Sequence, residues 1–258
     1  IVSGDSVHNM LVEKVAIMGF AQAIRFPDVD DGDPWIGQIR ISEVLIDCVA
    51  GIYINGSLDV CYINKVHAWP FATKGLVGEV DADRYRTGAA FKIDDSADWT
   101  KFTDCFSYGY AYGFHLYDAQ YVTLLGCGTD YPSTLGATTP NGIRIQSTSA
   151  TTQIIGFQAA GQYFGINMSV SGSSGAVQVI GGTFWDLDAS AILVDDGDLI
   201  VTGTKFWNLP QVIGINSGNA GKISIDSCIF DTISSAVFAE HADHDKSYWS
   251  IGKNNLYV

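Results

Sequence analysis

Short apolar runs alternate with polar residues along the whole chain and recur at a nearly constant interval. Each run begins with a small residue followed by an aliphatic or aromatic one, as in Gly51-Ile-Tyr-Ile and Gly165-Ile-Asn-Met. The first apolar residues of these runs are at positions 24, 52, 91, 114, 143, 166, 192, 215 and 237. Alternation with a period of two indicates strands, and a fixed interval of 20 to 50 residues indicates a solenoid.

The spacings are 28, 39, 23, 29, 23, 26, 23 and 22 residues, so the base period is near 23 and the longer spacings contain insertions. A second alternating run and a third, aromatic run complete the interval, as in Lys205-Phe-Trp-Asn-Leu. No segment has the pattern of a long amphipathic helix. We therefore predict an all-β fold, a right-handed single-stranded parallel β-helix of about nine coils over residues 1–258. An antiparallel sandwich is the alternative, but it does not explain the repeat.

The repeat predicts ladders of equivalent side chains, because one coil lies about 4.8 Å from the next. Phe184, Phe206 and Phe230 occupy the same coil position and are expected to stack inside. Trp185 and Trp207 come one residue later, so they are expected to point outward on consecutive coils. Two exposed indoles in a row suit either a sugar-stacking platform or a surface covered by a partner subunit.

The five cysteines are at 48, 61, 105, 127 and 228, without a C-x-x-C motif. This spacing fits neither a zinc site nor a dense disulfide framework. Cys105, Cys127 and Cys228 share one coil position, three residues after an inward apolar residue, and are expected to be small buried hydrophobic residues.

Two insertions interrupt the period, at 68–88 and 130–140, and each immediately precedes a strand of the first kind. Both therefore leave the same corner of the coil, with a single coil between them. Insertions in a solenoid form loops on one face, where function is commonly placed. The two loops are expected to border a cleft.

The cleft would contain carboxylates at a spacing that suits glycoside hydrolysis, which uses two of them at about 5 to 9.5 Å. The catalytic candidates are Asp130, Glu79 and Asp104. The residues expected to bind substrate there are His67, Trp69, Arg84, Tyr85, Arg86 and Tyr108, with Trp185 and Trp207 further along. A polysaccharide lyase, using a base and cationic residues to neutralise a uronate, is the alternative reaction.

The charge balance restricts the partners. The formal net charge is −14, from 28 acidic and 14 basic residues, which argues against nucleic acid as a ligand. No apolar run approaches the ~20 residues of a membrane span, so no membrane insertion is expected. The sequence contains no Gly-rich phosphate loop, no nucleophile elbow and no H-E-x-x-H motif, and we expect neither a cofactor nor a metal.

Several sequence segments between residues 67 and 130 resemble the pectate-lyase-like β-helix domains of bacteriophage tailspikes. They are His67-Ala-Trp-Pro-Phe, Arg86-Thr-Gly-Ala-Ala-Phe, Asp98-Trp-Thr-Lys-Phe-Thr-Asp-Cys-Phe and Gly126-Cys-Gly-Thr-Asp. As architecture the resemblance covers essentially the whole chain.

The resemblance implies an extracellular homotrimer on a virion, the phage tail, that binds and cleaves bacterial surface polysaccharide, either capsule or O-antigen. No catalytic residue transfers by motif, because active sites vary in that family. The chain opens on Ile1-Val-Ser-Gly-Asp, inside a coil, so we expect a fragment of a longer protein. A non-catalytic glycan-binding module and a structural spacer of a trimeric fibre are the other two hypotheses.

Overall fold

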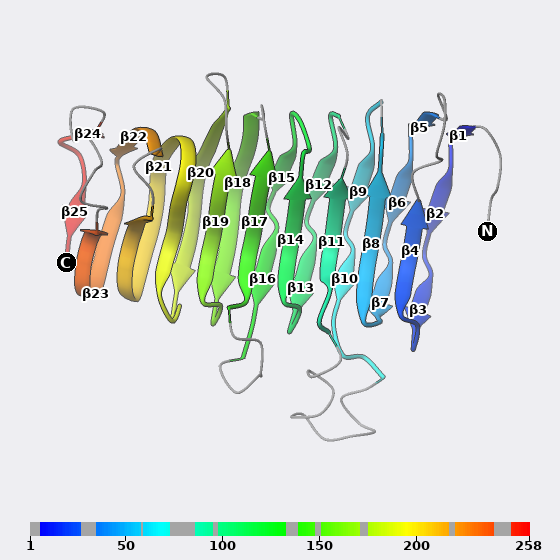
Figure 1. Cartoon of the computed structure of the whole chain (residues 1–258). Helices are drawn as coiled ribbons and strands as arrows, with labels where there is room; N and C mark the ends of the chain where they lie inside the picture. The colour runs from blue at the N-terminus through cyan, green and yellow to red at the C-terminus, as the bar shows by residue number, and fades with distance from the viewer. Residues whose placement is uncertain are drawn as a thin grey trace.

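The computed structural model of the chain shows a solenoid of parallel strands (Figure 1). It describes residues 6–26, 35–57, 59–72, 86–94, 98–132, 139–147, 151–170, 175–216, 220–239 and 249–258. Over these residues there is no helix, and every pairing between named strands is parallel. Each strand pairs with the strands one coil before and one coil after it, which confirms the predicted parallel β-helix.

The strands form three columns, which we call the first, second and third columns in the order in which each coil passes through them. The first column consists of β4 (Gln22–Phe26), β8 (Ala50–Asn55), β11 (Ala89–Asp94), β14 (Tyr112–Tyr117), β17 (Asn141–Ser147), β19 (Phe164–Val170) and the beginning of β21 (Ser190–Ile215).

The second column consists of β2 (Leu11–Glu13), β6 (Arg40–Ser42), β9 (Tyr62–Asn64), β12 (Lys101–Thr103), β15 (Thr123–Leu125), the first halves of β18 (Thr151–Ala160) and β20 (Ala176–Trp185), the middle of β21, β22 (Ala220–Asp226) and β24 (Trp249–Ile251).

The third column consists of β3 (Ala16–Met18), β7 (Leu45–Asp47), β10 (His67–Ala68), β13 (Phe106–Tyr108), β16 (Gly128–Asp130), the later parts of β18, β20 and β21, β23 (Ile229–Ala239) and β25 (Leu256–Tyr257). Two further strands, β1 (Ser6–His8) and β5 (Trp35–Gly37), pair with each other in a separate two-stranded sheet.

The register of the first column agrees with the predicted repeat up to Ile192. The inward residues 24, 52, 91, 114, 143, 166 and 192 pair in succession. The next two predicted positions, 215 and 237, are wrong. Ile213 pairs with Phe238, and the Asn216 N–H donates to the Val194 carbonyl at 3.1 Å, which places Ile213 beside Ile192.

A two-residue shift of register keeps the same side chains facing inward, which is why the pattern could not detect it. Ile213 and Ile215 are both buried. The wrong position at 237 has a local cause, because the register of β21 against β23 shifts between Leu209 and Gln211. Pro210 lies at this shift and has no N–H to donate to the ladder.

Aromatic and aliphatic side chains fill the interior in ladders. Phe184, Phe206 and Phe230 stack as predicted, with ring centroids 5.5 and 5.7 Å apart. In an earlier part of the solenoid, Phe91 and Phe114 stack at 4.7 Å. All five cysteines are buried free thiols, which confirms the prediction for the three in the shared coil position. Burial raises the pKa of these thiols at Cys105 and Cys228, so they act as apolar filling.

The corner between the second and third columns has left-handed backbone at one residue in each of nine successive coils, from Lys14 to Ser227. Residues of several types hold this position, and they form the corner row. The row consists of Lys14, Glu43, Lys65, Asp104, Gly126, Gly156, Gly181, Gly203 and Ser227, with φ between 51° and 65°. A left-handed residue turns the chain sharply and lets its N–H bond to the next coil, as Lys65 does to Thr103 at 2.9 Å.

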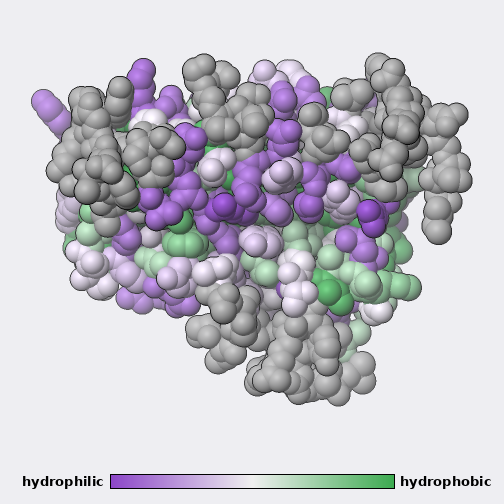
Figure 2. Space-filling view, viewed as in Figure 1, coloured by the Kyte–Doolittle hydropathy of each residue, from purple (hydrophilic) through white to green (hydrophobic). Residues whose placement is uncertain are grey.

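The outer surface of the first column is polar. Its outward row on consecutive coils is Arg25, Tyr53, Lys92, His115, Arg144 and Asn167. Figure 2, viewed like Figure 1, shows that hydrophilic colour predominates across this face. The alternation of the strands therefore separates an apolar interior from a hydrated exterior, as in a solenoid with one face of each sheet in water.

The two predicted insertions begin at neighbouring points. β10 and β16 both pair with β13 and end at the same edge of the third column (Figure 1). The strand spacing places their ends roughly 10 Å apart, with one coil between them. The prediction that both insertions leave one corner is confirmed for these described ends. Residues 73–85 and 133–138, the central parts of the insertions, lie outside the described residues.

Candidate functional site

The third column carries one outward row that contains most of the predicted site, and we call it the third-column row. Its members occupy the same register position on successive coils and are Met18, Asp47, Trp69, Tyr108, Asp130, Ala160, Trp185, Trp207 and Asp231. Trp69 belongs to it because its N–H donates to Ile46 at 2.9 Å and Ala68 pairs with Ile46.

The row joins residues that the sequence predicted separately. Trp69, Tyr108 and Asp130 were expected near the insertions, and Trp185 and Trp207 on a more distant platform. All five lie on one line along the solenoid. Five coil spacings separate Trp69 from Trp207, or about 24 Å. The row is therefore long enough to contact several units of a linear polymer.

Trp185 and Trp207 pair directly in register and both point away from the interior, as predicted. They differ in exposure. Trp207 is 41 % exposed, and the Lys205 ammonium lies 5.9 Å from its ring centroid, but Trp185 is half-buried. The prediction of two exposed indoles thus holds fully for Trp207 and partly for Trp185.

An aromatic cluster surrounds the beginning of the first insertion. Trp69 lies on Tyr108 with ring centroids 4.3 Å apart. His67 makes edge contacts with Phe71 at 5.3 Å and with Phe106 at 5.2 Å. Sequence reasoning missed Phe71 and Phe106. Their signal was the register, since Phe106 stands opposite His67 on the next coil.

His67 is a half-buried ring within this cluster. Burial lowers its pKa, so the imidazole is neutral at pH 7. Its Nε2 atom is buried and makes no hydrogen bond with the described residues. A neutral imidazole has one donor and one acceptor nitrogen, so Nε2 is a buried hydrogen-bonding atom that the described residues leave unused.

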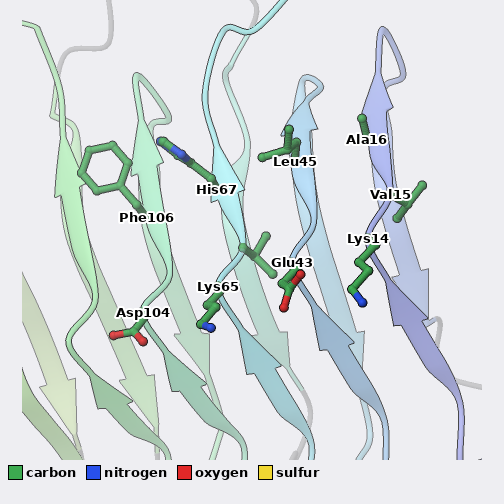
Figure 3. A pocket seen from close by; sticks show the side chains of 10 residues that line it. Lys14, Val15, Ala16, Glu43, Leu45, Lys65, His67, Asp104 and Phe106 are labelled. Carbon is green, nitrogen blue, oxygen red and sulfur yellow. The ribbon is translucent and has the colours of Figure 1, made fainter.

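A groove of about 640 Å³ lies beside the cluster, on the outer face between the corner row and the third column (Figure 3). Figure 3 shows its charged residues in one line across neighbouring strands, with His67 and Phe106 above them. The charged residues belong to the corner row and alternate in sign. They are Lys14, Glu43, Lys65 and Asp104.

Asp104 lies in this groove and not beside Asp130. It is four residues before Tyr108 along the chain, at the left-handed corner that precedes β13, and Tyr108 is the residue that pairs with Asp130. The two predicted carboxylates therefore lie at opposite ends of neighbouring strands, Asp104 before β13 and Asp130 at the end of β16. They are not opposite each other in register, as a catalytic pair on adjacent coils would be.

Asp130 has the environment of a carboxylic acid that stays protonated more readily than usual. It is half-buried at the end of β16, between Tyr108 and Ala160 in register. Burial raises its pKa, and the Tyr131 backbone N–H opposes this shift only in part. A carboxyl group with a raised pKa is suited to donating a proton.

Arg86 has a different place from the one predicted, because it lies below the surface. Its guanidinium bonds Asp47 at 2.6 Å, with both side chains 2 % exposed, and donates to the Tyr108 carbonyl at 3.1 Å. Asp47 also accepts the Ala72 N–H at 2.8 Å. The buried pair thus ties both ends of the first insertion to the solenoid.

The remaining predicted residues, Glu79, Arg84 and Tyr85, lie outside the described residues. Within the described ranges, no three His, Cys, Asp or Glu side chains come together in a way that could hold a metal ion. In the same ranges no helix has the length and apolar character needed to cross a bilayer.

Comparison of the chain with protein-family models, with curated proteins and with solved structures finds no match. The fold and the third-column row together define the class of this protein. It is a parallel β-helix with a line of aromatic and acidic residues on one outer face.

Proposed function

We propose that this β-helix binds a bacterial surface polysaccharide along the third-column row and cleaves it by hydrolysis. The observation that carries the proposal is the single register line of Trp69, Tyr108, Asp130, Trp185 and Trp207. Aromatic side chains present broad apolar faces with polar edges, which suits sugar rings. The resemblance to phage tailspike β-helices supports the same class of ligand.

In the hydrolysis reaction Asp130 is the general acid that protonates the glycosidic oxygen. Its burial favours the protonated form, and its place at the base of the second insertion puts it beside the aromatic cluster. We place the second carboxylate on another element, because Asp104 lies at the opposite end of β13 from the residue that pairs with Asp130. Glu79 of the first insertion is our candidate.

Purified capsular polysaccharides and O-antigens from a panel of bacteria test the reaction. We expect the protein to release new reducing ends from one of them, and Asp130→Asn to lower the rate about 100-fold or more while binding remains. Asp195→Asn, outside the row and paired with Arg144 of the first column, is the matched control and should leave the rate unchanged. An unsaturated uronate product would instead indicate the lyase reaction.

Binding is measured separately on the same panel. Trp207→Ala is expected to weaken retention on the polysaccharide that is cleaved, because it removes the most exposed ring of the row. Binding without any product would favour the non-catalytic module, and no binding to any polysaccharide would reject the proposed function.

The tailspike resemblance also supports a homotrimer on the virion. Light scattering on the purified chain tests this part of the proposal: a threefold mass is expected, and a monomer at high concentration would contradict it.

A further inference from the structure

A second exposed aromatic pair lies at the corner between the first and second columns, away from the third-column row. Trp99 and Tyr121 occupy neighbouring coils, with ring centroids 5.4 Å apart and an angle of 32° between the rings. Each side chain is 50 % exposed. The backbone holds them in place, since the Trp99 N–H donates to the Gln120 carbonyl at 3.1 Å.

The backbone of this pair is in a conformation that large side chains rarely adopt. The φ angles are 59° at Trp99 and 51° at Tyr121. Asn9 and Gln38 have the same left-handed geometry in the first coils, with φ of 56° and 54°. Asn accepts left-handed backbone readily, whereas a bulky aromatic residue is a true outlier there.

Neither local conformation nor burial explains aromatic residues at this corner. The left-handed backbone disfavours them, and half of each side chain remains in water. Contact between the two rings offsets part of the strain, but a polar residue would avoid it altogether. Positions that break a local rule without a packing reason are where functional residues are expected.

The surroundings of the pair are polar. Asp98 forms a parallel bridge with Gln120 directly beside it. Lys101 follows two residues after Trp99 and lies 6.0 Å from the ring centroid of Tyr62, which is itself 43 % exposed. Aromatic faces bordered by hydrogen-bonding groups suit a sugar ring, which has apolar C–H faces and hydroxyl edges. A protein-docking surface would instead have an apolar centre.

We propose that Trp99 and Tyr121 form a second glycan-binding site that stacks a pyranose ring of the same polysaccharide. The inference rests on the proposed function for the identity of the ligand. The two sites lie at opposite ends of the first-column strands. A strand such as β14, which is six residues or about 20 Å long, separates them. Figure 1 shows these two corners at opposite edges of the solenoid.

Two sites on one chain act together on a long polymer and separately on short fragments. A polymer that occupies one site brings its other segments near the second site at high effective concentration. Loss of the second site should therefore speed dissociation from the polymer strongly. It should change the number of bound fragments without changing the affinity of the third-column row.

The test compares four proteins on the panel of purified capsular polysaccharides and O-antigens. They are the wild type, the double variant Trp99→Asn with Tyr121→Asn, the control Gln38→Asn and the row variant Trp207→Ala. Asn suits the left-handed backbone, so the double variant should fold, which thermal melting confirms. Gln38→Asn makes the same kind of change at the same corner without removing an aromatic ring.

We expect the double variant to dissociate from the intact polymer about tenfold faster or more, and Gln38→Asn to behave as the wild type. With short oligosaccharides from that polymer, calorimetry should give about two sites on the wild type and about one on the double variant. If the double variant dissociated from the polymer at the same rate as the wild type, the second site would be overturned and the proposed function would remain intact. Binding lost only in the double variant would support the second site and reject the row.

Discussion

Two halves of the solenoid differ at the corner between the second and third columns. Up to Asp104 the left-handed position is held by exposed charged side chains, namely Lys14, Glu43, Lys65 and Asp104. From Gly126 to Gly203 it is held by glycine. Strands in the first half are mostly three residues long, whereas β18, β20 and β21 run through the corner for 10, 10 and 26 residues.

The glycine half is the regular half, and the charged half contains the groove and the base of the first insertion. Left-handed backbone costs a non-glycine residue about 1–2 kcal/mol. The charged side chains at the corner row thus work against stability at the coils where the groove lies. This contrast indicates that the second half is built for regular stacking, whereas the first half keeps charged side chains beside the groove; the third-column row runs through both halves.

The largest expected effect concerns the buried pair of the first half. Arg86→Ala leaves Asp47 as a buried carboxylate without its guanidinium and should lower the free energy of unfolding by about 3–5 kcal/mol. Urea denaturation measures it. The control is Lys205→Ala in the second half, whose ion pair with Asp231 spans 3.4 Å at the surface and should contribute less than about 1 kcal/mol. If the two variants lost the same free energy of unfolding, the contrast between the buried ion pair of the first half and the exposed ion pair of the second half would be contradicted.

A smaller effect is expected where glycine holds the corner. A Cβ at Gly181 would meet nothing within 4 Å, so Gly181→Ala tests the backbone alone. With φ at 58°, the variant should lose about 1–2 kcal/mol. Thermal or urea unfolding measures the loss. An unchanged stability would show that this corner tolerates side chains without strain.

The reverse change in the first half should stabilise the protein. Lys65→Gly relieves left-handed strain at φ 51° and should raise the free energy of unfolding by about 0.5–1 kcal/mol after the entropy cost of glycine. Lys101→Gly, on an ordinary strand of the same half, is the control and should lower it by a similar amount. The same sign in both variants would reject strain as the cause.

The smallest effect is expected at Asp130, at the base of the second insertion. Burial raises its pKa in the folded state, so its contribution to stability is present below the ordinary pKa of Asp. This contribution is lost as the pH rises through the folded pKa. Asp130→Asn should therefore raise the melting temperature at pH 7 relative to the wild type, and this gain should shrink at pH 4. A gain in melting temperature that is the same at pH 7 and pH 4 would contradict a raised pKa at Asp130.

The fold followed from the sequence because inward residues of a solenoid repeat once per coil. The marker positions from 24 to 192, the stack of Phe184, Phe206 and Phe230, and the shared corner of the two insertions were all visible in the spacing. Errors arose where the pattern is degenerate. Ile213 and Ile215 face the same way, and the shift beside Pro210 does not change which side chains are apolar.

What the sequence determined by itself was therefore the period, the interior and the places where the period breaks. Only the tertiary structure decided which outward residues meet, because that depends on register and backbone turn at each coil. It placed Trp69, Tyr108, Asp130, Trp185 and Trp207 on one line, moved Asp104 to a separate groove and buried Arg86 against Asp47. Outward side chains have no packing constraint from the core, so their partners cannot be deduced from hydrophobic spacing.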